Sequence, residues 1–137
     1  MLDLAGVNLW AVALVWLVYV TIGAFWYSPA GFAKQWTKLT GIDIMKLPKK
    51  DTSDAIRFVA LSALVQSFTL AVILHSLHVT ALVDGLFAGV VLWLGFTTAT
   101  TVGVTFYSQR TWKFLWLNSS YFLVVMTIGS IIFTLWQ

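Results

Sequence analysis

The chain has 137 residues, of which 60% are hydrophobic and 9% are charged, and its formal net charge is +3. A soluble domain of this length could not bury so much apolar surface, so the composition excludes an ordinary soluble protein and predicts one membrane domain over residues 1–137. The absence of cysteine excludes disulfides, thiolate metal sites and cysteine nucleophiles, and the small net charge gives no sign of a nucleic-acid partner.

The first apolar run covers about residues 4–27 and is long enough for a transmembrane helix, which needs about 20 apolar residues. It is preceded by Asp3 rather than by a basic stretch, and no small-residue cleavage site follows it. These features predict a retained helix rather than a signal peptide.

The stretch GAFWYSPAGFAKQWTK at residues 23–38 changes from aliphatic to aromatic and then to basic side chains. Phe32 and Trp36 fall on one helical face and Lys34 falls away from it. We therefore expect a short amphipathic helix over residues 29–40, lying in the membrane interface and meeting anionic lipid. This helix either anchors the first span or docks a partner or lipid. The residues expected at the interface are Trp26, Tyr27, Pro29, Phe32, Lys34, Trp36 and Lys38.

Two further apolar runs, about residues 55–77 and 80–107, are separated so narrowly that they must form a tight antiparallel hairpin. His75, His78 and Asp84 lie near this hairpin, and three such side chains could form a metal or proton site. Their spacing matches no zinc pattern, however. An interfacial position for the histidines and the helix dipole beside Asp84 also account for them.

The third apolar run carries small and hydroxyl side chains at intervals of four residues. Small residues let helix backbones approach closely, so we expect the third span to be the central helix, contacted on at least two faces. A threonine row could instead line a polar path. The residues expected to pack are Gly85, Gly89, Gly95, Ala99, Thr97, Thr101 and Gly103, and the row of four also contains Trp93 and Thr105.

The fourth apolar run covers about residues 114–136. Isolated polar side chains inside apolar spans are explained by hydrogen bonds between helices. We expect such interhelical bonds from Asn8, Gln66, Asn118 and Tyr121.

The basic residues indicate the orientation of the four spans. All eight lysine and arginine residues lie in or beside the connections after the first and third spans, residues 28–54 and 108–113. This bias predicts that both connections are cytoplasmic and that both termini lie outside, in a bacterial inner membrane.

Three segments resemble a bacterial membrane family known as domain of unknown function 1761. Residues 84–96 are similar to the family's third span, and Asn118 with Tyr121 matches an Asn-x-x-Tyr pattern in its last span. The resemblance implies a four-helix integral membrane protein and assigns it no activity. The first family motif, Gly-x-x-Trp-Tyr-Ser-Pro followed by Phe, Lys and Trp, is matched by Gly23, Trp26, Tyr27, Ser28, Pro29, Phe32, Lys34 and Trp36.

The chain departs from the family pattern in the last loop. Family members often carry an acidic residue and a glycine before the arginine of this loop, whereas this chain has Ser108 and Gln109 before Arg110. Any chemistry of that acidic residue would be missing here.

The sequence thus predicts an all-α integral membrane four-helix bundle with a short interfacial helix after the first span. It contains no set of nucleophile, base and orienting residue, so we expect neither an enzyme nor a cofactor. The favoured function is that of a structural or interaction protein that self-associates or joins a larger membrane complex. The alternative is an oligomeric channel or transporter for ions or small solutes, and an enzyme acting on lipid ranks last.

Overall fold

A computed structural model describes residues 3–136, and this part of the chain contains helices and no strand. In chain order the elements are α1 (Leu9–Trp26), α2 (Ala33–Thr40), the 3-10 helix η1 (Ile44–Lys46), α3 (Lys49–Ser76), α4 (Leu82–Leu92), the π-helical segment η2 (Trp93–Thr98), α5 (Ala99–Tyr107) and α6 (Trp112–Leu135).

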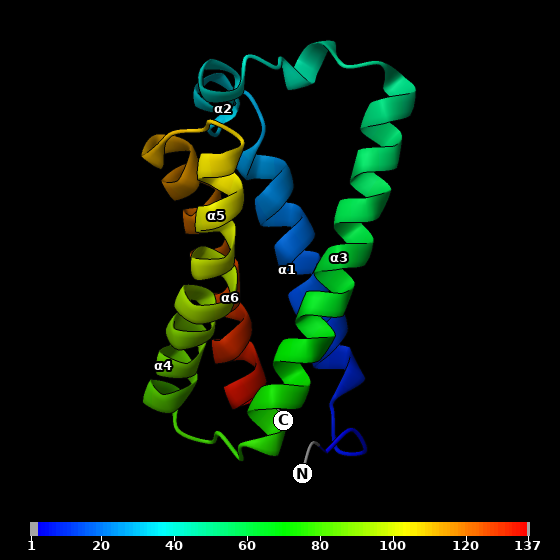
Figure 1. Ribbon diagram of the computed structural model, residues 1–137. Helices are drawn as coiled ribbons and strands as arrows, with labels where there is room; N and C mark the ends of the chain where they lie inside the picture. Colours follow the sequence, from blue (N-terminus) through cyan, green and yellow to red (C-terminus); the bar gives the residue numbers. More distant parts are fainter. Residues whose placement is uncertain (1–2, 137) are drawn as a thin grey trace.

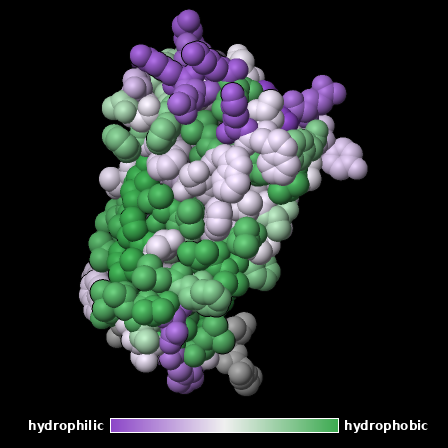
Figure 2. Space-filling model, turned by 90° about the vertical axis from the view of Figure 1, so that its left-hand side faces the viewer, coloured by the Kyte–Doolittle hydropathy of each residue, from purple (hydrophilic) through white to green (hydrophobic). Residues whose placement is uncertain are grey.

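Four helices are long and apolar enough to cross a membrane: α1, α3, α6 and the continuous helix formed by α4, η2 and α5, which we call the third span. Figure 2 shows a hydrophobic band between two hydrophilic ends. Large side chains such as Phe87 and Phe96 are more than two-thirds exposed, and lipid rather than water suits such a surface. The predicted all-α bundle with four candidate spans is confirmed.

The two ends of the bundle differ in charge. Residues 27–48 and 108–111 connect helices at one end, which we call the basic end because all eight lysine and arginine residues lie in or beside these connections. The opposite end, which we call the distal end, carries the start of α1, the connection at residues 77–81 and the end of α6 (Figure 1).

The central helix is α6, and the prediction that the third span is central was wrong. Helix α6 packs against α1, α3 and the third span, and it also contacts α2. The third span packs chiefly against α6, whereas α3 packs against α1 and α6. Figure 1 shows α3 and the third span on opposite sides of the bundle. Small residues indicate close contact on a helix face, but they do not say how many neighbours the helix has.

The core lies where α1, α3 and α6 meet. Val15, Leu74 and Val125 are fully buried, and Tyr19 is almost completely so. A Cβ atom at Gly129 of α6 would lie 3.0 Å from Cγ1 of Val15, which is tighter than an ordinary contact. Glycine at this position therefore lets α1 pack closely against α6.

Helix α1 begins at Leu9 because Asn8 caps it. The side-chain oxygen of Asn8 accepts hydrogen bonds from the backbone N–H groups of Trp10 (3.0 Å) and Ala11 (3.2 Å). A short amide side chain is well suited to this capping position. The prediction of an interhelical bond from Asn8 was therefore wrong, and the apolar residues before Asn8 precede the helix.

Helix α3 begins at Lys49, directly after Pro48, and therefore earlier than the predicted second span at residues 55–77. Its first turns carry charged residues, which hydropathy cannot assign to an apolar run. The sequence thus predicted the apolar part of α3 and missed its polar extension at the basic end.

Candidate functional site

At the basic end, aromatic side chains join the end of α1 to α6. The hydroxyl of Tyr27 donates a hydrogen bond to Oδ1 of Asn118 at 2.7 Å, and the indole N–H of Trp26 donates to the carbonyl oxygen of Leu117 at 3.2 Å. Both polar edges are thus turned toward α6. Helix α6 supplies an oxygen acceptor to each of them.

Tyr121 of α6 completes this contact. Its hydroxyl donates to the carbonyl oxygen of Tyr19 at 2.9 Å, and its ring lies edge-on to that of Tyr27, with centroids 5.9 Å apart. A Cβ atom at Gly23 would lie 3.1 Å from the Tyr121 hydroxyl oxygen, so glycine leaves room for the tyrosine. We call this cluster the aromatic junction: Gly23, Trp26, Tyr27, Asn118 and Tyr121.

Helix α2 follows a tight turn and does not begin at Pro29 as predicted. The N–H of Phe32 donates to the carbonyl oxygen of Trp26 at 2.7 Å, which folds the chain back onto the end of α1. A Cβ atom on Gly31 would lie 2.3 Å from the carbonyl oxygen of Phe25 and 2.7 Å from that of Trp26. The turn therefore accommodates glycine alone, and Pro29 lies exposed within it.

The other end of α2 is held by Arg110. Gly41 ends the helix in the left-handed conformation, with φ of 75°, which glycine adopts readily. The guanidinium of Arg110 donates to the carbonyl oxygens of Leu39 (3.2 Å) and Thr40 (2.9 Å). A cation at a helix C-terminus is favourable, so Arg110 fixes α2 against the start of α6.

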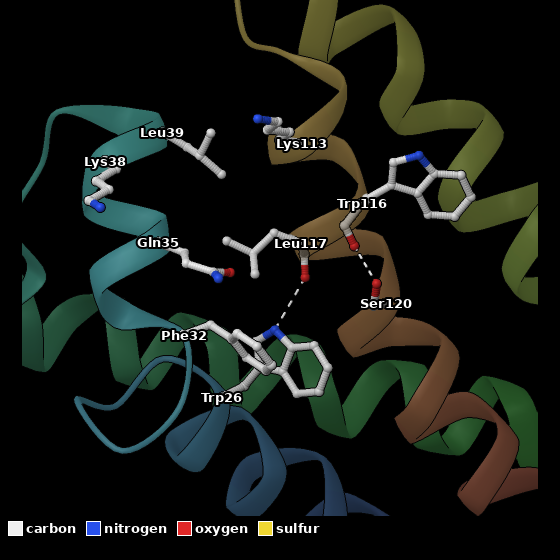
Figure 3. A pocket seen from close by; sticks show the side chains of 9 residues that line it. All are labelled: Trp26, Phe32, Gln35, Lys38, Leu39, Lys113, Trp116, Leu117 and Ser120. Atoms are coloured by element: carbon white, nitrogen blue, oxygen red, sulfur yellow. Dashed lines mark hydrogen bonds between the residues drawn. The ribbon is translucent and has the colours of Figure 1, made fainter.

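A cavity of about 690 Å³, which we call the basic-end pocket, lies between α2 and α6. In Figure 3, Gln35 and Leu39 of α2 and Leu117 of α6 point into the space between the helices, and the ammonium of Lys113 points toward α2. The ring of Trp116 points away from this space. The lining residues are Trp26, Phe32, Gln35, Lys38, Leu39, Lys113, Trp116, Leu117 and Ser120.

A second cavity, which we call the lateral groove, opens between α3 and the third span because these two helices make little contact. It measures about 560 Å³, and a smaller cavity of about 250 Å³ shares Tyr19, Gln66 and Phe122 with it. Its polar side chains are hydroxyl or amide groups with neither an acid nor a base among them. They are Tyr19, Gln66, Thr69, Thr97, Thr100 and Thr101.

The π-helical segment η2 shifts the register of the third span. Gly89 and Trp93 face α6 four residues apart, and the indole N–H of Trp93 donates to the carbonyl oxygen of Ser119 at 2.7 Å. Next, two neighbouring residues reach α6: the Thr97 hydroxyl donates to Sδ of Met126 at 3.5 Å, and the Thr98 hydroxyl hydrogen-bonds with that of Ser119. A π turn inserts one residue, so both positions meet α6, and Thr97 also lines the lateral groove.

The two glycines before η2 pack against α6. A Cβ atom at Gly85 would lie 2.2 Å from Oγ1 of Thr134, and one at Gly89 would lie 2.7 Å from Oγ of Ser130. The absence of a side chain at these two positions brings α4 and α6 together.

The small residues after the start of η2 do not pack within the chain, so the prediction for Gly95, Ala99 and Gly103 was wrong. A Cβ atom at Gly95 or Gly103 would meet no atom within 4 Å, and Ala99 is exposed. Thr101 is exposed as well, and its hydroxyl donates to the carbonyl oxygen of Thr97 in its own helix at 2.7 Å. These residues therefore lie on a face of the third span that α6 does not cover, whereas Thr105 on the same segment is buried.

The aromatic junction joins residues of two separate sequence motifs, one at the end of α1 and one in α6. A family model described as a protein of unknown function, DUF1761, matches residues 10–134. The chain belongs to this family. The resemblance stated from the motifs is thereby confirmed, and the junction gives the DUF1761 motif residues a structural role in fastening α1 to α6. No curated protein and no solved structure matches the chain.

The departure from the DUF1761 pattern in the last loop falls at a conformationally demanding position. Gln109 has φ of 54°, in the left-handed region that favours glycine. The glycine found there in other family members therefore suits the turn between α5 and α6, which glutamine makes here at a conformational cost.

The structure separates the predicted group His75, His78 and Asp84. His75 Nε2 lies 3.5 Å from a carboxylate oxygen of Asp3, whose pKa is held below its usual range by the N–H of Ala5 and by His75. His78, with φ of 54°, lies in the turn after α3, and Asp84 lies in the first turn of α4. Within residues 3–136, no three His, Asp or Glu side chains gather closely enough to hold a metal.

Gln66 bonds within its own helix, so the interhelical bond predicted for it was wrong. Its Nε2 donates to Oγ of Ser62, one turn earlier in α3, at 3.0 Å. The spacing of four residues brings these two side chains onto the same helix face. The Gln66 side chain therefore lines the lateral groove, and its amide makes no hydrogen bond to another helix.

The sequence analysis did not single out two residues that shape the basic-end pocket. Lys113 was assigned only to a basic loop, yet it lies at the same pocket as Lys38. Gly31 was not singled out, although a glycine between an aromatic run and a helix is a signal for a tight turn. The ammonium, hydroxyl and amide groups that line the basic-end pocket and the lateral groove can bind and orient a ligand.

Proposed function

We propose that this DUF1761 protein is a non-enzymatic membrane protein that acts by associating with transmembrane helices, first of all with a second copy of itself. The observation that supports this best is the bare face of the third span formed by Gly95, Ala99 and Gly103. Helices in lipid associate through close backbone packing and polar contacts rather than through the hydrophobic effect.

The contrast within one helix supports the proposal. Gly85 and Gly89 are explained by the close approach of α6, but Gly95 and Gly103 face open space. Glycine lowers the intrinsic stability of a helix by about 1 kcal/mol relative to alanine, so two glycines without a packing role inside the chain favour a partner outside it.

The lateral groove adds polar surface on the same span. The hydroxyl groups of Thr100 and Thr101 donate to carbonyl oxygens of their own helix, and their oxygen atoms remain able to accept a hydrogen bond. Polar surface exposed to hydrocarbon is unfavourable, and contact with another span would reduce it.

The double substitution Gly95→Leu/Gly103→Leu is expected to lower the dimer fraction at least several-fold, because leucine keeps the backbone of a second copy at a distance. Single-molecule photobleaching in lipid vesicles at graded protein-to-lipid ratios measures this fraction. Ala24→Leu, an exposed small-to-large change in α1, serves as the control and should leave it unchanged. A wild type that stays monomeric at every ratio, or an equal effect of the control, would refute the proposal.

We further propose that the basic end faces the cytoplasm and that both termini lie on the opposite side, since every lysine and arginine lies at that end. The chain has no cysteine, so a thiol-reactive label reacts only with a cysteine that is introduced by substitution. With a membrane-impermeant maleimide, Thr80→Cys should react in intact cells and Lys50→Cys only after permeabilisation. The reverse pattern, or labelling of both in intact cells, would contradict this orientation.

The second candidate function is a solute conduit within such an assembly, favoured by the hydroxyl and amide groups that line the lateral groove. The groove opens sideways, so one chain cannot enclose a path and a conduit needs the same oligomer. Flux of ions or small solutes into proteoliposomes distinguishes the two candidates, since a purely structural assembly conducts nothing.

A further inference from the structure

The basic-end pocket combines two free cations with an apolar wall. Lys38 comes from α2 and Lys113 from α6, and both are exposed at the rim. Neither lysine has an ion-pair or hydrogen-bond partner in the part of the chain that the structure describes. The fold thus places two positive charges from separate elements at the rim of one cavity; Figure 3 shows the Lys113 ammonium pointing toward α2 and the exposed Lys38 side chain at the outer edge of α2, from which it reaches a bound anion by rotating.

The nearby acidic residues leave this charge unbalanced. None of the residues that line the pocket is acidic. Of the acidic residues at the basic end, Asp43 pairs with Lys46, Asp54 pairs with Arg57, and Asp51 lies in the first turn of α3. Arg110 is already committed to the end of α2. The lysines of the pocket are therefore the cations that remain available there for an external anion.

The walls of the pocket indicate what kind of anion fits. Trp26, Phe32 and Leu117 form an apolar wall of the cavity that Lys38 and Lys113 also line (Figure 3). An inorganic anion gains nothing from such a wall, whereas an acyl chain does. A volume of about 690 Å³ lies within the usual range for ligand sites, and Gln35 and Ser120 supply hydrogen-bonding groups between charge and wall.

We propose that the basic-end pocket binds one anionic phospholipid, with its phosphate between Lys38 and Lys113 and an acyl chain against Trp26, Phe32 and Leu117. This site does not depend on self-association, because all its residues come from one chain. The lipid links α2 to α6, and its headgroup takes the position of a counterion for both lysines.

The test is native mass spectrometry of the full chain in mild detergent, titrated with phosphatidylglycerol or with phosphatidylcholine carrying the same acyl chains. The wild type should retain one phosphatidylglycerol in preference to phosphatidylcholine. Lys38→Gln/Lys113→Gln should lower phosphatidylglycerol affinity about tenfold or more, since each lysine near an anionic headgroup contributes appreciably. The control Lys49→Gln/Lys50→Gln removes the same charge at the same end, outside the pocket, and should keep the affinity.

Three results would overturn the site. An equal loss in the control would mean that the basic end attracts lipid only by its overall charge. Equal retention of phosphatidylglycerol and phosphatidylcholine would exclude recognition of the anion. Complete displacement of the lipid by glycerol phosphate at matched concentration would show that the pocket binds a free phosphate and makes no use of its apolar wall. All substituted lysines are exposed, and circular dichroism verifies that each variant keeps its helices.

Discussion

Gly31→Ala is expected to destabilise the protein by about 3 kcal/mol, because the added methyl group has no space. Its Cβ atom would lie 2.3 Å from the carbonyl oxygen of Phe25 and 2.7 Å from that of Trp26. These are backbone atoms, so no side-chain rotation relieves the overlap. The turn between α1 and α2 must open, which moves α2 away from α6 and disturbs the hydrogen bond from Phe32 to Trp26.

The measurement is unfolding in mixed micelles by titration with sodium dodecyl sulfate, followed by tryptophan fluorescence and far-ultraviolet circular dichroism. Gly103→Ala is the matched control, because its Cβ atom would meet nothing within 4 Å. This control should be neutral or stabilising by up to about 1 kcal/mol, as expected for alanine in an exposed helix. If both variants unfolded at the wild-type detergent fraction, the turn between α1 and α2 would have room for a side chain at position 31.

The four spans could be predicted from the sequence because the membrane imposes a simple rule. Each span must be helical and apolar over about 20 residues, and a hydropathy pattern reports this directly. The ends of the helices were less predictable. Asn8 interrupts an apolar run and caps α1, and α3 extends beyond its apolar part to Lys49. A hydropathy pattern identifies neither helix caps nor polar helical turns.

The arrangement of the spans could not be predicted in the same way. In a soluble bundle an apolar face identifies the core, but here lipid and core are both apolar, so the pattern does not distinguish inward from outward faces. The rows of four residues in the third span also assume a constant helical repeat. The π-helical segment η2 breaks this assumption, so that two neighbouring residues reach α6, Thr97 at Met126 and Thr98 at Ser119.

For the candidate sites too, the sequence indicates individual residues but not which of them lie close together. The motif residues Trp26, Tyr27, Asn118 and Tyr121 could be singled out from the sequence, but their mutual contacts depend on how α1 and α6 meet. The basic-end pocket needs Lys113 from a segment far from α2 in the chain. The pocket therefore follows only from the way in which α2 and α6 pack together, which the sequence does not indicate.

Gly89→Leu is expected to destabilise the bundle by about 3 kcal/mol, while Gly95→Leu in the same span should change stability by less than about 1 kcal/mol. At Gly89 the new Cβ atom alone would lie 2.7 Å from Oγ of Ser130 and 3.2 Å from the backbone oxygen of Met126, so α4 must move away from α6. At Gly95 there is no atom within 4 Å to displace.

The same detergent titration measures both variants at a low protein-to-lipid ratio, where association contributes little to stability. Because the two substitutions are chemically identical and six residues apart in one helix, their difference reports only which face of the helix is packed. Gly89 is an inner position, and Gly95, about 120° further round the helix, is an outer one. Equal destabilisation by the two leucines would show that the face at Gly95 is packed as well, and the bare surface on which self-association depends would then lie inside the bundle.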